Sequence, residues 1–404
     1  MVKKMQIKEI NKDDLNKFLN STNHSLYQTD EYAKTMEKQG FSIKLLGLEE
    51  NGNIIGSTIL LIIKKQGFNY AYAPRGFVID YNNEPLVKTF TQEIKKYCKK
   101  NNIVAIKLNP LIIKEKNNVK QDNYDKIFDT LKKLGYSHLG YNDFFESFKP
   151  RYEAKIEMKD PNILFNNIKK EYKTKIRGAI NNGVEIHKGT YDDLKYLYAH
   201  TEKKYPRNLL YFEYLYYYFS QNKKADFFYA ELNCSKLLNK FRTLYIKQEE
   251  ICKRIDELIK KEQSNKLTAL KIEADNLLGK YHSHLTNATK LMQTNPKGII
   301  IAECLFIKEN NEAYMIMDGY DKNYKKYNAK HLLIWEAMNY YKNSKYLNLG
   351  GITSLKEDKY HGLNQFKMNF GSMCYEYIGD LELVCIPTKY FLLKNLRPYE
   401  NIIK

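Results

Sequence analysis

The amino-acid sequence predicts an α/β protein in which one folding unit occurs twice and a long helical hairpin interrupts the second copy. Apolar strands alternate with amphipathic helices, one strand and helix layout recurs, and a proline-free segment past the middle steps its apolar residues by three and four. A chain of 404 residues has room for two or three domains. Its 43% hydrophobic content allows sizeable cores.

The first region runs to about residue 150 and mixes helices with strands. A helix is predicted over residues 30–39, and a second over residues 86–99. Two apolar runs flank Asn51-Gly52, a dipeptide typical of tight hairpins. We therefore expect antiparallel strands on either side of this turn and a mixed sheet in the region as a whole.

The repeated layout is visible in two stretches that lie far apart in the chain. Residues 52–76 contain a pair of strands and are followed by a helix and by the strand at 103–110. Residues 296–320 show the same order, followed by a helix and by the strand at 345–351. We interpret this similarity as an internal duplication of one α/β unit.

The segment between residues 235 and 295 has the pattern of a coiled coil. A polar break at 263–265 divides it, so we expect two antiparallel helices, each on the order of 40 Å long at 1.5 Å per residue. The expected seam positions are Leu237, Phe241, Leu244, Gln248, Ile251, Ile255 and Leu258, then Leu267, Leu270, Ala274, Leu277, Tyr281, His284, Ala288 and Leu291. The alternative is a plain helical hairpin packed on the body of the protein.

These patterns predict three parts. The first domain covers residues 1–150, and the second covers residues 151–234 together with 296–404. The coiled-coil hairpin, residues 235–295, is inserted into the second domain at a loop, where insertions are tolerated.

The chain is strongly basic, with a formal charge of +19 from 66 Lys and Arg against 47 Asp and Glu. Such a balance favours polyanionic partners, which include nucleic acid, phosphorylated lipid and an anionic membrane surface. The alternative for part of the excess lysine is genome composition, because Lys, Asn, Ile and Tyr, which are all abundant here, are the residues of AT-rich codons. We expect neither a signal peptide nor a membrane span, because the first residues lack an apolar stretch and no apolar run approaches the ~20 residues that a span needs. We expect a cytoplasmic protein that can be peripheral at the inner membrane face.

Several chemistries lack their sequence signals. The six cysteines are scattered without metal-ligand spacing, so no metal site and no disulfide framework are expected. The phosphate-binding loop of nucleotide hydrolases, the dinucleotide fingerprint and the GxSxG motif of serine hydrolases are absent. ATP-dependent ligation, hydride transfer and serine hydrolysis are therefore unsupported.

Five short stretches occur in a characteristic order: LYQTDEYAK, AYAPRGFVID, YLNLGGI, GLNQFKMNFG and EYIGD. With these stretches and the inserted hairpin, the chain resembles the FemABX peptidoglycan aminoacyltransferases over nearly its whole length. The resemblance implies two acetyltransferase-like (GNAT) domains in tandem. It also implies transfer of Gly, Ala or Ser from aminoacyl-tRNA, as co-substrate without another cofactor, to the stem peptide of lipid II or UDP-MurNAc-pentapeptide.

Phe366 and Lys367 match the place of the family's catalytic lysine. Aminolysis of an ester passes through an oxyanion, and a fixed cation stabilises that charge more in the transition state than in the ground state. Phe366 is expected to place the lysine and to shield the site. The alternative interpretation is a surface lysine next to a core phenylalanine.

The resemblance also implies a site for the acceptor's diphosphate at Lys34, Arg207 and Tyr211. Arginine offers a two-pronged hydrogen-bonding fork and lysine a point charge, and a diphosphate needs both charge and orientation. Lys38, one helical turn after Lys34, is an alternative to it.

The general base is not identified by the sequence. Some relatives carry Asp where this chain has Asn109, and an amide does not accept a proton at neutral pH. His361 is as plausible a surface residue as it is a base.

Two basic elements are candidates for contact with tRNA phosphates or anionic lipid. One continuous helix over 162–180 would place Lys169, Lys173 and Arg177 near one face, although a solvated face is an equal alternative. The hairpin holds twelve basic against seven acidic residues between 235 and 295. It could lie along tRNA, bind a partner protein or associate with a second copy.

Two other functions remain open. An acyl-CoA-dependent GNAT acyltransferase is suggested by the fold, but residues 319–333 lack the glycines of a pyrophosphate-binding loop. A non-catalytic RNA-binding or scaffold protein would use the hairpin and the basic charge alone.

Overall fold

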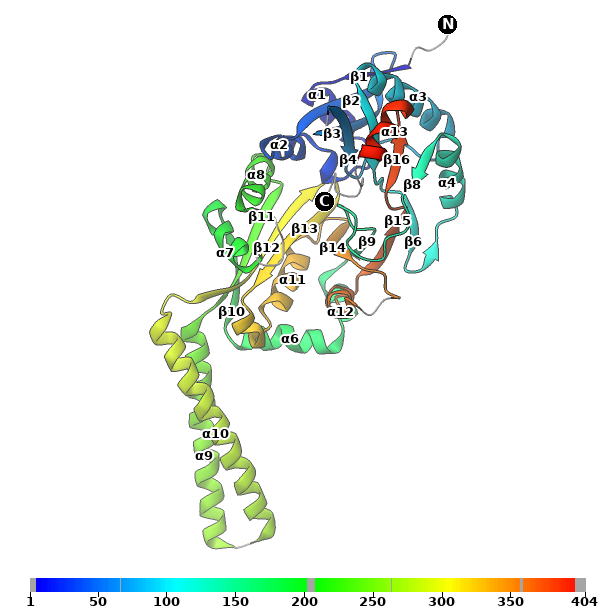
Figure 1. The fold of residues 1–404 in the computed structure, drawn as a ribbon. Helices are drawn as coiled ribbons and strands as arrows, with labels where there is room; N and C mark the ends of the chain where they lie inside the picture. Colours follow the sequence, from blue (N-terminus) through cyan, green and yellow to red (C-terminus); the bar gives the residue numbers. More distant parts are fainter. Residues whose placement is uncertain (1–4, 66, 202–207, 263, 357–358, 397–404) are drawn as a thin grey trace.

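The computed structural model describes residues 5–65, 67–201, 208–262, 264–356 and 359–396. These residues form two mixed sheets, lying end to end, and a helical hairpin that projects from the second sheet (Figure 1). The predicted α/β class is confirmed.

The first half of the chain supplies most of a seven-stranded sheet. Its elements are β1 (Met5–Glu9), α1 (Lys12–Leu19), η1 (Leu26–Gln28), α2 (Asp30–Lys38), β2 (Ser42–Glu50), β3 (Asn53–Lys65), β4 (Phe68–Ala73), α3 (Glu84–Lys100), β5 (Ile103–Leu108), β6 (Ile113–Lys116), β7 (Val119–Lys120), α4 (Tyr124–Lys133) and β8 (Tyr136–His138). Asn51 and Gly52 both adopt positive φ, 51° and 84°, as a tight turn between β2 and β3 requires. The predicted hairpin is confirmed.

The second half supplies most of a nine-stranded sheet. Its elements are β9 (Tyr152–Glu157), α5 (Pro161–Asn167), α6 (Lys170–Asn181), β10 (Val184–Gly189), η2 (Tyr191–Asp193), α7 (Leu194–Thr201), α8 (Leu209–Ser220), β11 (Ala225–Leu232), α9 (Cys234–Lys261), α10 (Asn265–Thr294), β12 (Ile299–Glu309), β13 (Glu312–Tyr320), η3 (Lys322–Tyr327), α11 (Ala329–Tyr340), β14 (Tyr346–Ile352), α12 (His361–Met368), β15 (Met373–Tyr377), β16 (Leu381–Val384) and α13 (Pro387–Leu396).

The two sheets repeat one strand order, which confirms the predicted duplication. The first runs β1-β2-β3-β4-β5-β16-β8, and the second contains β10-β11-β12-β13-β14-β9-β15. In each, four antiparallel strands are followed by one parallel pair, β4 with β5 or β13 with β14, and then by antiparallel neighbours.

Each half also lends strands to the other sheet. β16, near the end of the chain, pairs with β5 and β8 of the first sheet. β6 pairs with β15, so β6 and β7 extend the second sheet. The division between the two sheets therefore does not fall at residue 150, because the chain crosses it in both directions.

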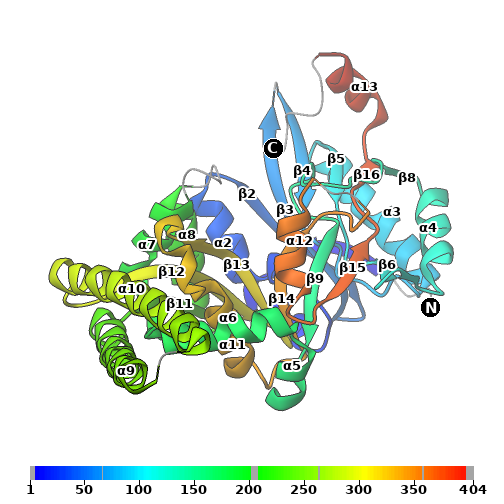
Figure 2. The ribbon, with the colours of Figure 1, turned by 90° about the horizontal axis from the view of Figure 1, so that it is seen from below.

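Helices cover both faces of the second sheet (Figure 2). Residues of β12 alternate between two cores: Cys304 packs with α11, whereas Leu305 packs with α7 and α8. The core beside α7 and α8 also holds residues of α1 and α2. The two halves are thus joined by a shared apolar core.

The helix predicted over 162–180 is wrong, because it is interrupted between α5 and α6. Ile168 is extended and 2% exposed, since its side chain enters the core of the second half. The backbone N–H of Lys169 donates to the carbonyl oxygen of Asn369 at 3.0 Å. Burial of Ile168 and this tertiary hydrogen bond override the local helical pattern.

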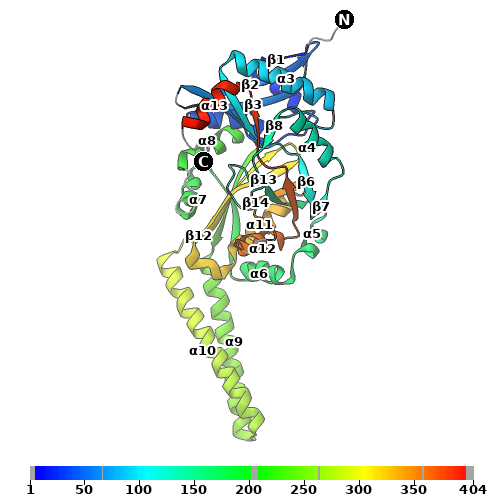
Figure 3. The same ribbon diagram turned by 45° about the vertical axis from the view of Figure 1, so that its right-hand side comes forward.

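The hairpin consists of α9 and α10, which extend well beyond the sheets (Figures 1 and 3). The predicted seam is right at alternate positions only. Ile251, Leu258, Leu270 and Leu277 are 38–51% exposed, while Cys252 and Lys271 turn inward beside the correctly predicted Gln248 and Ala274. The predicted register is one residue early at every second step. Ile251 and Leu270 outweigh Cys252 and Lys271 in an apolar pattern, and Leu258 and Leu277 are as apolar as the Ile259 and Leu278 that follow them. Among the described helices, none is long and apolar enough to cross a lipid bilayer.

Candidate functional site

The site is built where two parallel strands of the second sheet separate. β13 and β14 pair only from Glu312 with Tyr346 to Tyr314 with Asn348, although both strands continue further. The Oδ1 atom of Asn348 accepts the backbone N–H of Gly350 at 2.8 Å, and Gly350 has a φ of 79°. This local turn carries β14 away from β13 and opens a gap between them.

Lys367 reaches this gap from α12, the helix that follows β14. Its ammonium Nζ donates to the carbonyl oxygen of Gly351 at 2.8 Å, and its side chain is buried, with the residue 7% exposed. A Cβ atom added at Gly350 would lie 3.6 Å from this Nζ and 3.3 Å from the carbonyl oxygen of Met315. The ammonium therefore lies at the point where the strands divide.

Burial lowers the pKa of Lys367 to about 8. The nearby Asp318 carboxylate opposes this change, and the Lys330 ammonium reinforces it. Desolvation disfavours the charged form of a lysine. Lys367 still holds its proton for most of the time at neutral pH, so it offers a buried cation at the strand gap. This arrangement does not fit a surface lysine.

Phe366 lines a pocket of about 440 Å³, whereas Lys367, the next residue, is not among its lining residues. Lys330 lies with its Nζ 4.6 Å from the centre of the Phe366 ring, and it forms an ion pair with Asp318. Its pKa is raised, since the attraction of Asp318 outweighs the effect of burial. The pocket is lined by aromatic and basic side chains, which include Tyr320, Tyr324, Lys325, Lys330, His331 and Phe366.

The expected acceptor residues lie on the helices between the halves. Lys34 on α2 is partly exposed and pairs with Asp30 at 2.6 Å, which raises the pKa of Lys34. Tyr211 on α8 is buried in the core that includes Tyr32 of α2. Arg207 lies outside the described residues. Neither Lys34 nor Lys367 is among the lining residues of the pockets found in the described parts of the chain.

The three basic residues expected on one helix are divided by the interruption. Lys169 precedes α6 and is exposed, whereas Lys173 and Arg177 lie on α6. Lys173 donates to the carbonyl oxygen of Asn166 at 3.0 Å, and the charged groups of Lys173 and Arg177 lie 5.6 and 5.4 Å from the centre of the Phe165 ring. This pair forms a small basic face together with Phe165.

The two positions considered for a general base differ in their surroundings. Asn109 is buried: its Oδ1 accepts the backbone N–H of Arg75 at 2.8 Å, and its Nδ2 donates to Asp380 at 3.2 Å. His361 is exposed at the start of α12. Asn109 belongs to a closed hydrogen-bond network of the first half.

Sequence reasoning missed an acid–imidazole pair on the other face of the second sheet. The Nδ1 atom of His200 lies 2.9 Å from both carboxylate oxygens of Glu303, and the hydrogen bond to Glu303 raises the pKa of His200. Burial raises the pKa of Glu303, which is 1% exposed. These residues are 103 positions apart, so no local motif signals the pair.

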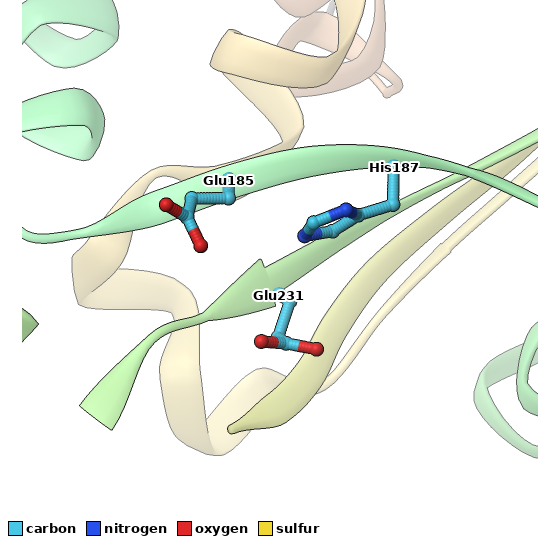
Figure 4. A group of neighbouring side chains, drawn as sticks. All are labelled: Glu185, His187 and Glu231. Atoms are coloured by element: carbon cyan, nitrogen blue, oxygen red, sulfur yellow. The ribbon is translucent and has the colours of Figure 1, made fainter. Parts of the chain in front are cut away.

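One group of side chains near the root of the hairpin has the composition of a metal site. Glu185 and His187 on β10 and Glu231 on β11 place ligand atoms within 4.8 Å of one another (Figure 4). Glu185, however, pairs with Lys236 and accepts a hydrogen bond from Asn233 at 3.0 Å. The Lys236 hydrogen bond is the main cause of the lowered pKa of Glu185. We infer that Glu185 fastens the start of α9 to β10.

Comparison with known proteins shows similarity over nearly the whole chain. The FemAB family matches residues 10–397. A lipid II:glycine glycyltransferase from Staphylococcus epidermidis is 24% identical over 93% of this chain and 92% of its own length. The enzyme of the same name from Staphylococcus aureus is 23% identical over the same shares of both chains. The crystal structure of FemX superposes with a TM-score of 0.76 at 20% identity, covering 96% of this chain and all of that one.

The repeated sheet order defines a protein with two acetyltransferase-like units in tandem, and the second unit holds a buried cation where its parallel strands separate. Within that class, the chain belongs to the FemAB family.

Proposed function

We propose that this protein transfers glycine from glycyl-tRNA to the stem peptide of lipid II. The observation that carries the proposal is the buried Lys367 ammonium at the separation of β13 and β14. The relatives named for glycyl transfer to lipid II support the choice of amino acid and acceptor.

The reaction needs an amine, an activated ester and a cation. The acceptor's amine attacks the ester carbonyl carbon and forms a carbon–nitrogen bond, and the carbonyl oxygen becomes an oxyanion. Lys367 would stabilise this oxyanion. Collapse of the intermediate breaks the bond to the tRNA ribose oxygen, which takes up a proton as the acceptor nitrogen loses one. The product is an amide, and no oxidant or metal is required.

The pocket beside Phe366 would hold the end of the tRNA. Tyr320, Tyr324 and Phe366 offer faces on which a base can stack, while Lys325 and Lys330 offer positive charge to phosphate. An acyl-CoA enzyme would carry a glycine-rich loop at the position that η3 and the start of α11 occupy here. The six residues of η3, Lys322–Tyr327, include no glycine. This difference favours tRNA over acyl-CoA as the donor.

The acceptor would approach from the side of α2 and α8. In this proposal Lys34 and Arg207 bind its diphosphate and Tyr211 supports the contact, as the family resemblance implies. A lipid-linked acceptor would bring the enzyme to the inner face of the cytoplasmic membrane. Lys169, Lys173 and Arg177 would attract either the tRNA or anionic lipid.

The test is a transfer assay with the wild-type protein and defined substrates. Glycyl-, alanyl- and seryl-tRNA and acetyl-CoA would each be combined with lipid II and with UDP-MurNAc-pentapeptide. We expect labelled glycine to appear on lipid II. Transfer only from acetyl-CoA would support the acyl-CoA alternative, and no transfer from any donor, with donors and acceptors shown intact, would support a non-catalytic role.

A further inference from the structure

The helical hairpin carries an exposed apolar row that neither half of the protein covers. Ile251 and Leu258 on α9 are 45% and 51% exposed, and Leu270 and Leu277 on α10 are 43% and 38% exposed. Within each helix the two residues are seven positions apart, so they share one face. Both helices extend beyond the sheets along most of their length (Figures 1 and 3).

Contacts between the helices show that these four residues lie on the same side of the hairpin. The Nε2 atom of Gln248 donates to the carbonyl oxygen of Ala274 at 3.1 Å, which fixes the antiparallel register. Lys271 bridges Asp256 and Asp275 at 2.9 and 3.0 Å on one flank of the seam. In an antiparallel pair the corresponding flanks of both helices meet, so the exposed apolar residues gather on the opposite flank.

Basic residues border this apolar row on both helices. They occupy the next helical position outward from the row: Lys247, Arg254 and Lys261 on α9, and Lys266 and Lys280 on α10. One acidic residue, Glu273, shares these positions. The other acidic residues of the hairpin lie elsewhere on it: Glu249, Glu250, Asp256, Glu257, Glu262 and Asp275. One side of the hairpin is therefore apolar along its middle and basic along its edges.

We propose that this side of the hairpin, the α9–α10 membrane face, docks on an anionic phospholipid bilayer. Aliphatic side chains can enter the headgroup boundary, and lysine and arginine beside them can meet lipid phosphates with their long stems still in apolar surroundings. The inference deepens the proposed function by naming the surface that brings the enzyme to a lipid-linked acceptor.

Two other occupants fit this face less well. A second copy of the hairpin would set two basic borders against each other, and like charges repel. Nucleic acid would satisfy the basic borders, but aliphatic side chains do not stack on bases as aromatic ones do. The combination of an aliphatic middle and basic edges matches a lipid surface.

The test is flotation of the full-length protein with vesicles of phosphatidylglycerol and phosphatidylcholine, or of phosphatidylcholine alone, without lipid II. The wild type is expected to float with the anionic vesicles. The double variant Ile251→Ser/Leu270→Ser should bind them at least ~10-fold more weakly. The matched control is Ile246→Ser/Ile272→Ser, which removes two residues that are 48% and 59% exposed on other faces of the same helices and should bind within about twofold of wild type.

A second pair of variants tests the basic edges. Lys247→Gln/Arg254→Gln should weaken binding to anionic vesicles by ~10-fold or more, whereas Lys253→Gln/Lys260→Gln, away from the edges, should change it little. Circular dichroism would show that the hairpin stays folded in each variant.

Three results would overturn the inference. The wild type could fail to float with anionic vesicles, or both members of a matched pair could lose binding equally. Substitution of Ile251 and Leu270 could also weaken a dimer or a tRNA complex and leave vesicle binding unchanged. Because the vesicles carry no acceptor, failure of glycyl transfer would leave this result unaffected.

Discussion

The two halves share a strand order but differ at the ends of their parallel strands. In the first half, β4 and β5 stay paired to the last residue of each strand, Ala73 with Leu108. In the second half, β13 and β14 separate after Tyr314 and Asn348. Duplication has thus preserved the sheet, while an opening between the strands exists only in the second copy.

The residues at the two positions differ accordingly. In the first half, Asn109 follows β5 and bonds to Tyr72, Arg75 and Asp380. In the second half, the carbonyl oxygen of Gly351 accepts a hydrogen bond from Lys367, and a Cβ atom at Gly350 would lie 3.6 Å from the same ammonium. We infer that the first half mainly helps to bind the acceptor and that the transfer reaction takes place in the second half.

Breaking the junction between the halves should have the largest effect on stability. Arg75 of the first half contacts Glu153 of the second at 2.6 Å, and both are buried. Glu153→Gln should lower the free energy of unfolding by ~3 kcal/mol or more, because it leaves a buried cation without its partner. Urea unfolding measures this change. Glu157→Gln, on the same strand but 42% exposed, is the control and should change little.

The same residue gives a pH dependence. Burial alone would raise the pKa of Glu153, but Arg75 and Lys155 outweigh it and lower this pKa to about 2. A lowered carboxyl pKa stabilises the fold at pH above its ordinary value of 4.5, and that stabilisation is lost as the pH falls toward 2. Wild type should therefore lose more stability than Glu153→Gln between pH 4.5 and 2. Parallel pH curves for the two proteins would contradict this explanation.

Removing the buried charge at the gap should stabilise the second half. Lys367→Met is expected to raise the free energy of unfolding at pH 7 by on the order of 2 kcal/mol, because the folded state holds this proton less tightly than the unfolded chain. Folding lowers the pKa of Lys367 from 10.5 to about 8. As the pH rises between these two values, the wild type becomes more stable, and its difference from Lys367→Met in the free energy of unfolding becomes smaller. Lys330→Met should instead destabilise, since it leaves Asp318 without its ion pair. Thermal unfolding at pH 7 and 10 distinguishes the two variants.

Closing the gap should reduce transfer and stability by smaller amounts. Gly350→Ala introduces a Cβ at a φ of 79° and within 3.3 Å of the Met315 carbonyl oxygen, at a strain of ~1–2 kcal/mol. The matched change Gly279→Ala, on α10 with open space around it and outside the site, should be neutral or stabilising by ~0.5–1 kcal/mol. Equal rates of glycine transfer in the two variants would show that the opening between β13 and β14 has no part in the reaction.

The smallest effect is expected at the acceptor side. Lys34→Ala should raise the KM for lipid II by ~5-fold with little change in kcat, since it removes one exposed charge contact. Lys38→Ala, one turn along α2 and exposed, should leave both constants unchanged. A larger effect of Lys38→Ala than of Lys34→Ala would indicate that Lys38, and not Lys34, contacts the diphosphate.

The sequence predicted features that depend on local pattern. The Asn51-Gly52 turn, the repeated unit and the helices over residues 30–39 and 86–99 follow from turn chemistry and periodicity, which act over a few residues. The break at Ile168 was missed because it depends on burial in the core and on a hydrogen bond to Asn369, far along the chain.

The candidate site also combines a residue that a local motif predicts with residues that only the fold brings close to it. Lys367 was found because a continuous motif surrounds it, but its partners come from four elements: Gly350 from β14, Asp318 from β13, Lys330 from α11 and Glu153 from β9. Only the folded sheet brings these groups together, so their effect on the lysine could not be read from the chain. The roles of Lys34, Arg207 and Tyr211 remain predictions.

The most direct test of the account is the single-turnover rate of glycine transfer from glycyl-tRNA to lipid II by wild type and by Lys367→Ala. The control is Lys132→Ala, an exposed lysine on α4, the helix that follows β5 in the first half as α12 follows β14. The expected rate is ~10²–10³-fold lower than that of wild type for Lys367→Ala and close to that of wild type for Lys132→Ala. A Lys367→Ala variant that transfers glycine at the wild-type rate would contradict the central claim.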